Sequence, residues 1–380
     1  MIVMLFCFLF GATATTRVAG SGATTGSISQ QEAGPSSADL GRLIEALKSP
    51  NAVERATAAC SLGELREAAA PAISHLIRLL GDDTPVRILE CGGRGKGNFS
   101  SDDDSPGREA AIALSRIGPL AIEPMILALK TQEWQARKNA AFGLGLVKDD
   151  RSVEPLMAAI NDSAWQVRAQ AAWGLGLKRD ERVAAPLINA LKDAEWQVRE
   201  QAAWASGLVG NRDSVEPLSN ALRDANSSVR AQAAWALGLK GNRDAVEPLM
   251  AALKDSDPHV RAQSAWALGL KGDSRAVESL VEALKDTDGH ARAQAAWALG
   301  LKGDYRAVEA LGAATKDENN HVRKQATWAL GMILMRDRRA ANMNIKIEVD
   351  PTLQEDEPDS PDRKRERQRG RNKTKEKDNN

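Results

Sequence analysis

Hydrophobic and polar positions recur along most of the chain with a period of 31 residues. Each unit reads approximately D-x-A-V-E-P-L-x-x-A-L-K-D-x-x-x-x-V-R-A-Q-A-A-W-A-L-G-L-K-G. A fixed period of this length is typical of a repeat protein in which each unit is one supersecondary element. An arginine, a glycine and a proline mark the same places in successive units: Arg137, Arg168, Arg199, Arg230, Arg261, Arg292 and Arg323; Gly145, Gly176, Gly207, Gly238, Gly269, Gly300 and Gly331; and Pro124, Pro155, Pro186, Pro217 and Pro248.

Each unit predicts two helices. In the first half, as at residues 244–249, an aspartate can cap the helix and Pro248 is tolerated in the first turn, because its missing N–H has no helical acceptor there. The second half, as at residues 229–239, is alanine-rich and strongly helix-forming, and Gly238 together with the Lys240-Gly241-Asn242 turn is expected to close it. Because no such αα-hairpin buries its apolar face alone, the units should stack into an all-α, right-handed α-solenoid with one continuous core.

Two degenerate copies extend the array toward the N-terminus. Residues 53–63 match a second helix, and residues 108–114 match another. A loop insertion at about residues 87–106, rich in Gly, Asp and Ser, precedes the latter. The sequence therefore predicts about nine two-helix repeats within residues 37–336, of which the first two are divergent capping units.

A helical wheel of the second helix separates its core stripe from its other face. With Val167 at 0° and about 100° per residue, Ala171 and Leu175 fall at about 40° and 80° and define the stripe. Trp173 falls at about 240° and Gln170 at about 300°. Both series therefore point away from the hydrophobic stripe of their own helix.

These residues resemble the HEAT family, specifically its short, phycobilisome-lyase-like repeats, over about four fifths of the chain. The resemblance implies the fold. It leaves the function open, because the family includes scaffolds, bilin lyases, a hydroxylase and arrays fused to bacterial membrane sensors.

The resemblance also implies which face is concave. In the metal-dependent deoxyhypusine hydroxylases, a His-Glu dyad follows the arginine, faces the inside of the superhelix and holds two irons. No His-Glu dyad occurs in this sequence, which excludes that chemistry. The corresponding pairs are Lys138-Asn139, Ala169-Gln170, Glu200-Gln201, Ala231-Gln232, Ala262-Gln263, Ala293-Gln294 and Lys324-Gln325.

We therefore expect a glutamine and tryptophan ladder on the concave face that binds a partner. Tryptophan is enriched among interface hot spots, and amides pair with exposed peptide backbone. In the alternative, each tryptophan tucks against the next repeat and is mostly buried; both hold if one ring edge packs and the other stays exposed. The ladder consists of Gln170, Trp173, Gln201, Trp204, Gln232, Trp235, Gln263, Trp266, Gln294, Trp297, Gln325 and Trp328, with Phe142 at its N-terminal end.

An aspartate stands six residues before most of the repeated arginines and forms a second, structural ladder with them. The aspartate ends the first helical segment and the arginine opens the second, so the pair should bridge the turn within a unit or reach the neighbouring unit. Catalysis would not need so many identical copies. The pairs are Asp162 and Arg168, Asp193 and Arg199, Asp224 and Arg230, Asp255 and Arg261, Asp286 and Arg292, and Asp317 and Arg323.

Two shorter series lie at the start of the second helix. One precedes the arginine in three adjacent units and forms either local packing under the turn or a contact patch: Trp134, Trp165 and Trp196. The other is interpreted as surface histidines, because stacked repeats lie about 10 Å apart and adjacent copies cannot readily share one metal: His259, His290 and His321.

Composition excludes several classes of protein. The 51 basic and 51 acidic residues cancel, so overall charge selects neither a polyanionic nor a polycationic partner. Three Cys and four His exclude a disulfide-dense scaffold and leave little for a metal centre, although Cys60 and Cys91 could pair in an exported protein. No nucleophile–base constellation or carboxylate pair remains outside the repeat, so we expect no catalytic residue, cofactor or metal.

The two ends of the chain do not fit the repeat. Residues 1–14 hold an apolar run followed by Ala12-Thr13-Ala14, typical of a signal-peptide cleavage site, although no Lys or Arg precedes the run. Residues 15–36 are interpreted as a flexible linker, and residues 337–380 as a disordered tail, acidic and then basic. We expect export to the bacterial periplasm or cell envelope; a membrane-anchored or cytoplasmic protein is the alternative.

The favoured hypothesis is a noncatalytic, monomeric scaffold that binds a protein partner along its concave face and has no evident small-molecule substrate. A bilin or chromophore lyase-like activity is the alternative, followed by a deoxyhypusine hydroxylase-like oxidoreductase. The basic tail at residues 363–377 is interpreted as solvated, with weak contact to an anionic partner or nucleic acid as its alternative role.

Overall fold

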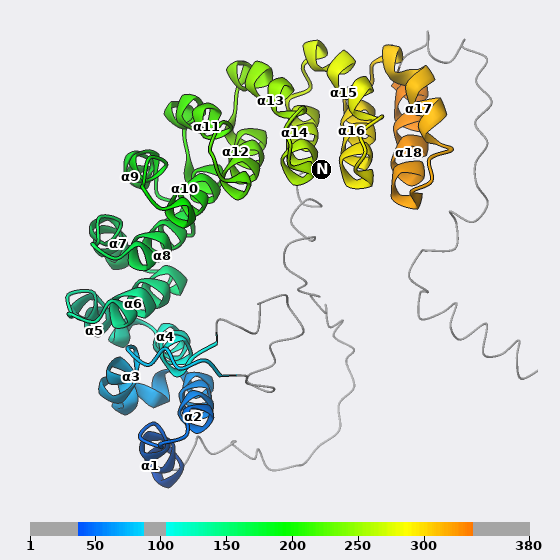
Figure 1. Ribbon diagram of the computed structural model, residues 1–380. Helices are drawn as coiled ribbons and strands as arrows, with labels where there is room; N and C mark the ends of the chain where they lie inside the picture. The colour runs from blue at the N-terminus through cyan, green and yellow to red at the C-terminus, as the bar shows by residue number, and fades with distance from the viewer. Residues whose placement is uncertain (1–36, 87–103, 337–380) are drawn as a thin grey trace, which may run out of the picture.

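The computed structural model describes residues 37–86 and 104–336, and every regular element in them is helical (Figure 1). The odd-numbered helices are α1 (Ser37–Ala46), α3 (Ile73–Leu79), α5 (Ile122–Ala128), α7 (Val153–Ala159), α9 (Ala184–Ala190), α11 (Val215–Ala221), α13 (Val246–Ala252), α15 (Val277–Ala283) and α17 (Val308–Ala314). The even-numbered helices are α2 (Ala52–Glu64), α4 (Pro106–Ile117), α6 (Trp134–Leu146), α8 (Trp165–Gly176), α10 (Trp196–Val209), α12 (Ser227–Lys240), α14 (Pro258–Lys271), α16 (Gly289–Lys302) and α18 (Asn320–Arg336). Within the described residues these pair into nine two-helix units, which confirms the predicted all-α solenoid.

The units stack side by side into an arc with two layers. Odd-numbered helices lie on the outer side of the arc and even-numbered helices line its hollow side (Figure 1). We call them outer and inner helices. A 3-10 turn leads into each outer helix from α3 onward: η2 (Arg66–Ala72), η3 (Pro119–Ala121), η4 (Asp150–Ser152), η5 (Glu181–Val183), η6 (Arg212–Ser214), η7 (Arg243–Ala245), η8 (Ser274–Ala276) and η9 (Tyr305–Ala307).

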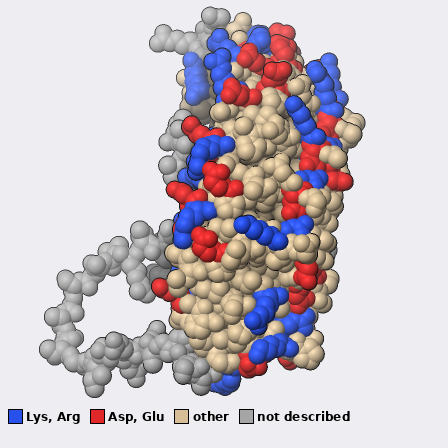
Figure 2. Space-filling view, turned by 90° about the vertical axis from the view of Figure 1, so that its left-hand side faces the viewer, with Lys and Arg blue, Asp and Glu red and all other residues tan. Residues whose placement is uncertain are grey.

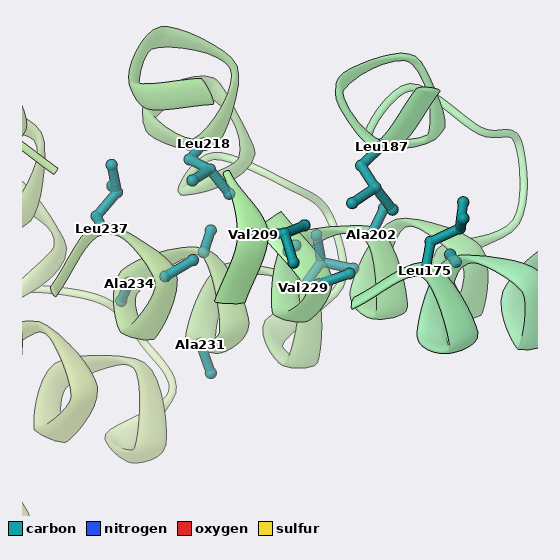
Figure 3. Packing of buried hydrophobic residues seen from close by; sticks show 14 of the residues in the cluster. Leu175, Leu187, Ala202, Val209, Leu218, Val229, Ala231, Ala234 and Leu237 are labelled. Carbon is teal, nitrogen blue, oxygen red and sulfur yellow. The ribbon is translucent and has the colours of Figure 1, made fainter. Parts of the chain in front are cut away.

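The core lies between the two layers and runs through every unit. Leu187 of α9 and Leu218 of α11 project from the outer helices toward the inner layer, where Leu175 and Val229 face the same interior (Figure 3). All four side chains are 0% exposed. Burying one such side chain contributes about 1.5–3 kcal/mol, so the core binds each unit to its neighbours as well as each outer helix to its inner partner.

The cap of the outer helical segment lies two residues before the expected aspartate. Because a 3-10 turn precedes α13, its segment begins earlier, and the side chain of Asn242 accepts a hydrogen bond from the N–H of Asp244. Other units place Asp149, Asp180, Asn211, Asp273 and Asp304 in the same role.

The prediction that the repeated glycines end the inner helices is wrong in all units but one, since only α8 ends at its repeated glycine, Gly176. Gly238 lies inside α12, which continues to Lys240. The predicted turn does close α12, with Gly241 as its C-cap. In two further units the cap is a left-handed glycine, Gly272 with φ 61° and Gly303 with φ 70°. The repeated glycine serves packing between helices instead, as the contacts of the inner layer show below.

The degenerate helix expected at residues 108–114 is α4, but its register differs by one residue from the prediction. A Cβ on Gly63 of α2 would lie 3.0 Å from the Cα of Ala113, just as one on Gly207 would lie 3.0 Å from the Cα of Ala236. This equivalence places Gly107, and not an arginine, at the position of the ladder arginine.

The joint between the second and third units therefore has a different chemistry. The N–H of Gly107 donates to the carbonyl of Asp82 at 2.8 Å, where other units use an arginine side chain. Thr131 stands where the next aspartate would be. An ion pair between Lys138 and Asp83, at 2.7 Å, joins the two units instead.

The signal peptide, linker, most of the insertion and the tail expected from the sequence lie outside the described residues. Among the helices of the described part, none combines the length and apolar character that crossing a bilayer requires.

Candidate functional site

Each inner helix presents a stripe of four side chains toward the hollow of the arc. In α8 these are Gln166, Gln170, Trp173 and Leu177, spaced by four, three and four residues, which places them on one face of a helix. The first three are half-buried and Leu177 is 39% exposed. Repetition of the unit turns the four positions into four rows along the groove.

The sequence reasoning assigned two of these four rows to the groove, those of Gln170 and Trp173, and left out the row of Gln166 and the leucine row. The leucines follow the glycine series by one residue and were counted with the helix end. Their exposure shows that they continue the groove surface, with Leu146, Leu177 and Leu239 each between 37% and 39% exposed. The leucine row consists of Leu146, Leu177, Leu208, Leu239, Leu270 and Leu301.

Each tryptophan of the ladder packs one ring edge against the preceding unit. A Cβ on Gly207 of α10 would lie only 2.6 Å from Cζ3 of Trp235 on α12. The same pairing joins Gly145 to Trp173, Gly176 to Trp204, Gly238 to Trp266, Gly269 to Trp297 and Gly300 to Trp328, with distances of 2.6–3.0 Å. The rings thus contact the preceding repeat, whereas the alternative stated above had them against the next one.

The rest of each ladder ring stays open to solvent. The five rings from Trp173 to Trp297 are half-buried, and Trp328 at the last described unit is 39% exposed. Within the described residues, the ladder amides and indole N–H groups make no hydrogen bond to the chain and are not among its buried unpaired atoms. These groups are therefore accessible to a partner.

A stacked cation closes the N-terminal end of the aromatic row. Phe142, at the ladder position of α6, stacks on Trp173 with ring centroids 5.2 Å apart and an interplanar angle of 28°. On its other side, the guanidinium carbon of Arg108 lies 4.2 Å from the Phe142 ring centroid. The row thus accommodates an arginine by cation–π contact.

Of the shorter tryptophan series, two members fit local packing under the turn and one fits an exposed contact patch. Trp134 and Trp165 are half-buried against the core, and the ammonium of Lys138 lies 5.5 Å from the Trp134 ring centroid. Trp196 is 38% exposed and stands at the first position of α10.

The histidine series lies at the start of three neighbouring inner helices. His259, His290 and His321 are all exposed. Partial burial, followed by the charges of the other two histidines, holds the pKa of His290 below its ordinary value against the opposing effect of Asp288. In the described ranges, no group of three or more His, Cys, Asp or Glu side chains is arranged to hold a metal ion.

The arginine and aspartate ladder joins neighbouring units. Nε and Nη2 of Arg230 donate to Oδ2 and Oδ1 of Asp255 in the following unit, at 2.7 and 2.8 Å. Nη1 of Arg230 donates at 2.9 Å to the backbone carbonyl of Asp224 in its own unit. The same bidentate pairs join Arg137 to Asp162, Arg168 to Asp193, Arg199 to Asp224, Arg261 to Asp286 and Arg292 to Asp317.

These pairs are largely shielded from solvent. The side chains of Arg230 and Asp255 are 13% and 11% exposed. On the side that Figure 2 shows, acidic and basic side chains intermix along the margins and leave a largely uncharged surface between them.

Comparison with known proteins identifies the family. HEAT repeats match residues 122–207, 153–227, 215–299 and 277–343. These matches cover more than half of the chain, so the protein belongs to the HEAT-repeat family. No curated protein matches the chain significantly in sequence.

Solved structures agree at the level of the fold. An importin beta structure has a TM-score of 0.59 and 15% identity over 78% of this chain and 47% of its own. YibA of E. coli has a TM-score of 0.52 and 22% identity over 70% of this chain and 92% of its own. The CpcE–CpcF complex of phycocyanin lyase from Nostoc sp. has a TM-score of 0.41 and 22% identity over 67% of this chain and 97% of its own.

Proposed function

We propose that this protein is a noncatalytic scaffold that binds a protein partner along the concave face of its solenoid. One observation carries the proposal. The glutamine and tryptophan ladder offers an amide and an indole N–H in every unit from α8 to α18, and neither group has a hydrogen-bond partner in the described chain. The leucine row adds apolar surface beside them.

The spacing of the ladder fits an extended segment of polypeptide. Neighbouring inner helices lie about 10 Å apart, and three residues of extended chain span about the same distance at about 3.3 Å each. A segment that runs along the groove therefore meets an equivalent amide and indole at every third residue. Amide side chains can pair with its backbone N–H and C=O groups, and the rings can cover its apolar side chains.

We also propose that the units are of the short repeat type and that the protein has neither a lyase nor a hydroxylase activity. The 31-residue period supports units of the short, phycobilisome-lyase-like type. A lyase or hydroxylase activity would need residues that hold a chromophore or irons, and the groove side chains offer amides, indoles and leucines in that place. A visible absorbance band after mixing with free bilin, or stoichiometric iron in the purified protein, would support those activities instead.

Export is a further part of the proposal. Its support is the apolar run in residues 1–14, together with Cys60, which is disulfide-bonded. Disulfides form and persist in oxidising compartments such as the bacterial periplasm.

The test is partner capture from the native cell envelope with the full chain as bait. A specific partner should bind the wild type and be lost with Gln232→Ala plus Gln263→Ala, since these amides have no partner in the fold and their removal leaves it intact. A Trp235→Ala plus Trp266→Ala variant should lose it as well.

A control variant removes exposed apolar surface from the outer side of the arc. Leu120 and Leu127 are 54% and 64% exposed beside and on α5, and their double alanine variant should retain the partner. A partner that binds all variants equally, or no partner at all, would contradict the proposed function.

A further inference from the structure

One carboxylate interrupts an otherwise uncharged part of a row of the inner helices next to the groove rows, in which the alanines of α12, α14 and α16 are buried. The position directly after the ladder arginine is alanine in four of the seven units from α5 onward and lysine in the first and last of them. In the third of the seven units, on α10, it is Glu200. The uncharged neighbours in this row are Ala169, Ala231, Ala262 and Ala293.

Glu200 has no partner of its own. Among the described residues it makes no ion pair and no hydrogen bond, and burial raises its pKa above the ordinary value for a glutamate. One turn earlier on the same helix, Oε1 of Gln197 is shielded from solvent and has no donor. Residues three apart on a helix are surface neighbours, so two acceptors without donors lie together.

Indole rings flank this pair of acceptors. Trp196 and Trp204 precede and follow Glu200 by four residues and lie on neighbouring turns of the same helix face. Between the neighbouring inner helices α4 and α6, the contact of Arg108 with Phe142 shows that a side chain at the position equivalent to Glu200 reaches the ladder ring of the following unit. The same step along the array leads from Glu200 to Trp235.

We propose that Glu200 anchors a single basic side chain, an arginine in preference to a lysine, of the extended segment that occupies the groove. The inference rests on the proposed function and adds the chemistry of its partner. A guanidinium can donate to the carboxylate and to Gln197 Oε1 at once, because it presents several N–H groups in one plane. Its flat face can stack on an indole, as the guanidinium of Arg108 stacks on Phe142.

Charge complementarity limits how many basic residues the bound segment can carry. Glu200 is the single acidic residue in its row, so one cation is neutralised and further cations would enter the groove without counter-charges. The matching partner is therefore an uncharged, partly apolar segment with one arginine. The polybasic residues 363–377 of this chain do not match that description.

The experiment selects phage-displayed random dodecapeptides on the immobilised full-length protein. The expected result is enrichment of peptides with one arginine among uncharged residues. Replacing that arginine by its neutral isostere citrulline should weaken binding about tenfold or more, since a hydrogen bond to a charged group contributes about that factor. Glu200→Gln should cause a similar loss, and the two changes together should cost no more than either alone.

A matched control tests whether the loss of any one negative charge would weaken peptide binding. Glu154 is an exposed glutamate on the outer helix α7, and Glu154→Gln should leave the affinity unchanged. Two outcomes would overturn the role of Glu200 and leave the proposed function standing. In one, the selected peptides are not enriched in arginine but still need Trp235 and Trp266 for binding. In the other, the peptides bind the wild type and Glu200→Gln equally well. Peptides that bind independently of both tryptophans would overturn both.

Discussion

The ring of Trp235 rests directly on the backbone of Gly207 in the preceding unit, so closely that a Cβ there would lie 2.6 Å from Cζ3. The Cα of Ala236 lies 3.0 Å from the same point, so backbone as well as a side chain blocks the space. The glycine is therefore needed for the approach of two inner helices.

Substitution of this glycine should destabilise the array. We expect Gly207→Ala to lower the free energy of unfolding by about 1–3 kcal/mol, because the added methyl group forces α10 and α12 apart or displaces the indole. Circular dichroism with urea as denaturant measures the change. Hydrogen exchange should show the loss of protection centred on these two helices, because in a solenoid each unit contacts only its neighbours.

The control for this prediction is the equivalent glycine of the last described unit. A Cβ on Gly331 would meet nothing within 4 Å, and the residue lies inside α18. Gly331→Ala should therefore stabilise the helix by about 0.5–1 kcal/mol, the ordinary preference of a helix interior for alanine. Equal effects at the two positions would refute the packing role of Gly207.

Loss of one ladder carboxylate should open one joint between units. Asp255→Ala removes two acceptors of Arg230 from a pair that is 13% and 11% exposed, and we expect a loss of about 2–4 kcal/mol. In comparison, Glu282→Ala breaks a pair with Lys285 in which both side chains are more than 70% exposed, and should change stability by less than about 1 kcal/mol. A comparable effect of the two variants would count against the ladder.

The same carboxylates should make the array sensitive to acid. Burial alone would raise the pKa of Asp255, but the hydrogen bonds from Arg230 and the N–H of Asp257 outweigh it and hold the pKa below 3.8. A lowered pKa in the folded state means that the pair stabilises the fold at neutral pH and that this contribution is lost as the pH falls below about 4. Acid titration of Asp255→Ala, followed by circular dichroism, should show a shallower loss than that of the wild type.

Glu200 should have the opposite pH dependence. Its pKa is raised in the folded state, so the folded chain binds its proton more tightly than the unfolded chain does. The stability of the wild type therefore falls as the pH rises above about 4.5, whereas a glutamine does not titrate. Glu200→Gln should melt at a higher temperature than the wild type at pH 7 and at the same temperature at pH 3.5; a lower melting point at pH 7 would contradict the cost assigned to this carboxylate.

Cys60 should resist alkylation until a reductant is added. It is disulfide-bonded and only 1% exposed, and the other two cysteines, Cys7 and Cys91, lie outside the described residues. Protein purified from its own compartment and unfolded in guanidinium should not react with iodoacetamide at Cys60, and should react there after treatment with dithiothreitol. Non-reduced peptide mapping then identifies the partner cysteine; labelling before reduction would show that the bond does not form.

Periodicity was sufficient to predict the helices, the stacking and the number of units, because every unit encodes the same local structure. It could not assign the ladder pairs, since the six residues from Asp224 to Arg230 and the 25 residues from Arg230 to Asp255 recur with equal regularity. Gly238 was misinterpreted for a related reason. A glycine near a helix end is typical of a cap, and only the ring of Trp266 in the next unit reveals its packing role.

For the groove rows as well, the sequence pattern did not show which side chains are exposed or paired. The wheel placed Gln170 and Trp173 away from the core, and the same arithmetic puts Leu177 at about 280°, between them. The sequence interpretation counted this leucine with the helix end instead, and its 39% exposure assigns it to the groove. The position of Glu200 was visible in the sequence only as one of several substitutions. Its lack of a partner depends on what surrounds it in three dimensions.

Each of the five units from α7 to α16 carries one half of each joint on either side: an arginine and a glycine for the unit that follows, an aspartate and a tryptophan for the unit that precedes. Any such unit therefore fits against any other. Insertion or deletion of 31 residues leaves all remaining joints complementary and adds or removes one positive and one negative charge of the ladder together. The length of the groove can thus change during evolution in whole steps, each worth about three residues of an extended ligand, without the invention of a new interface.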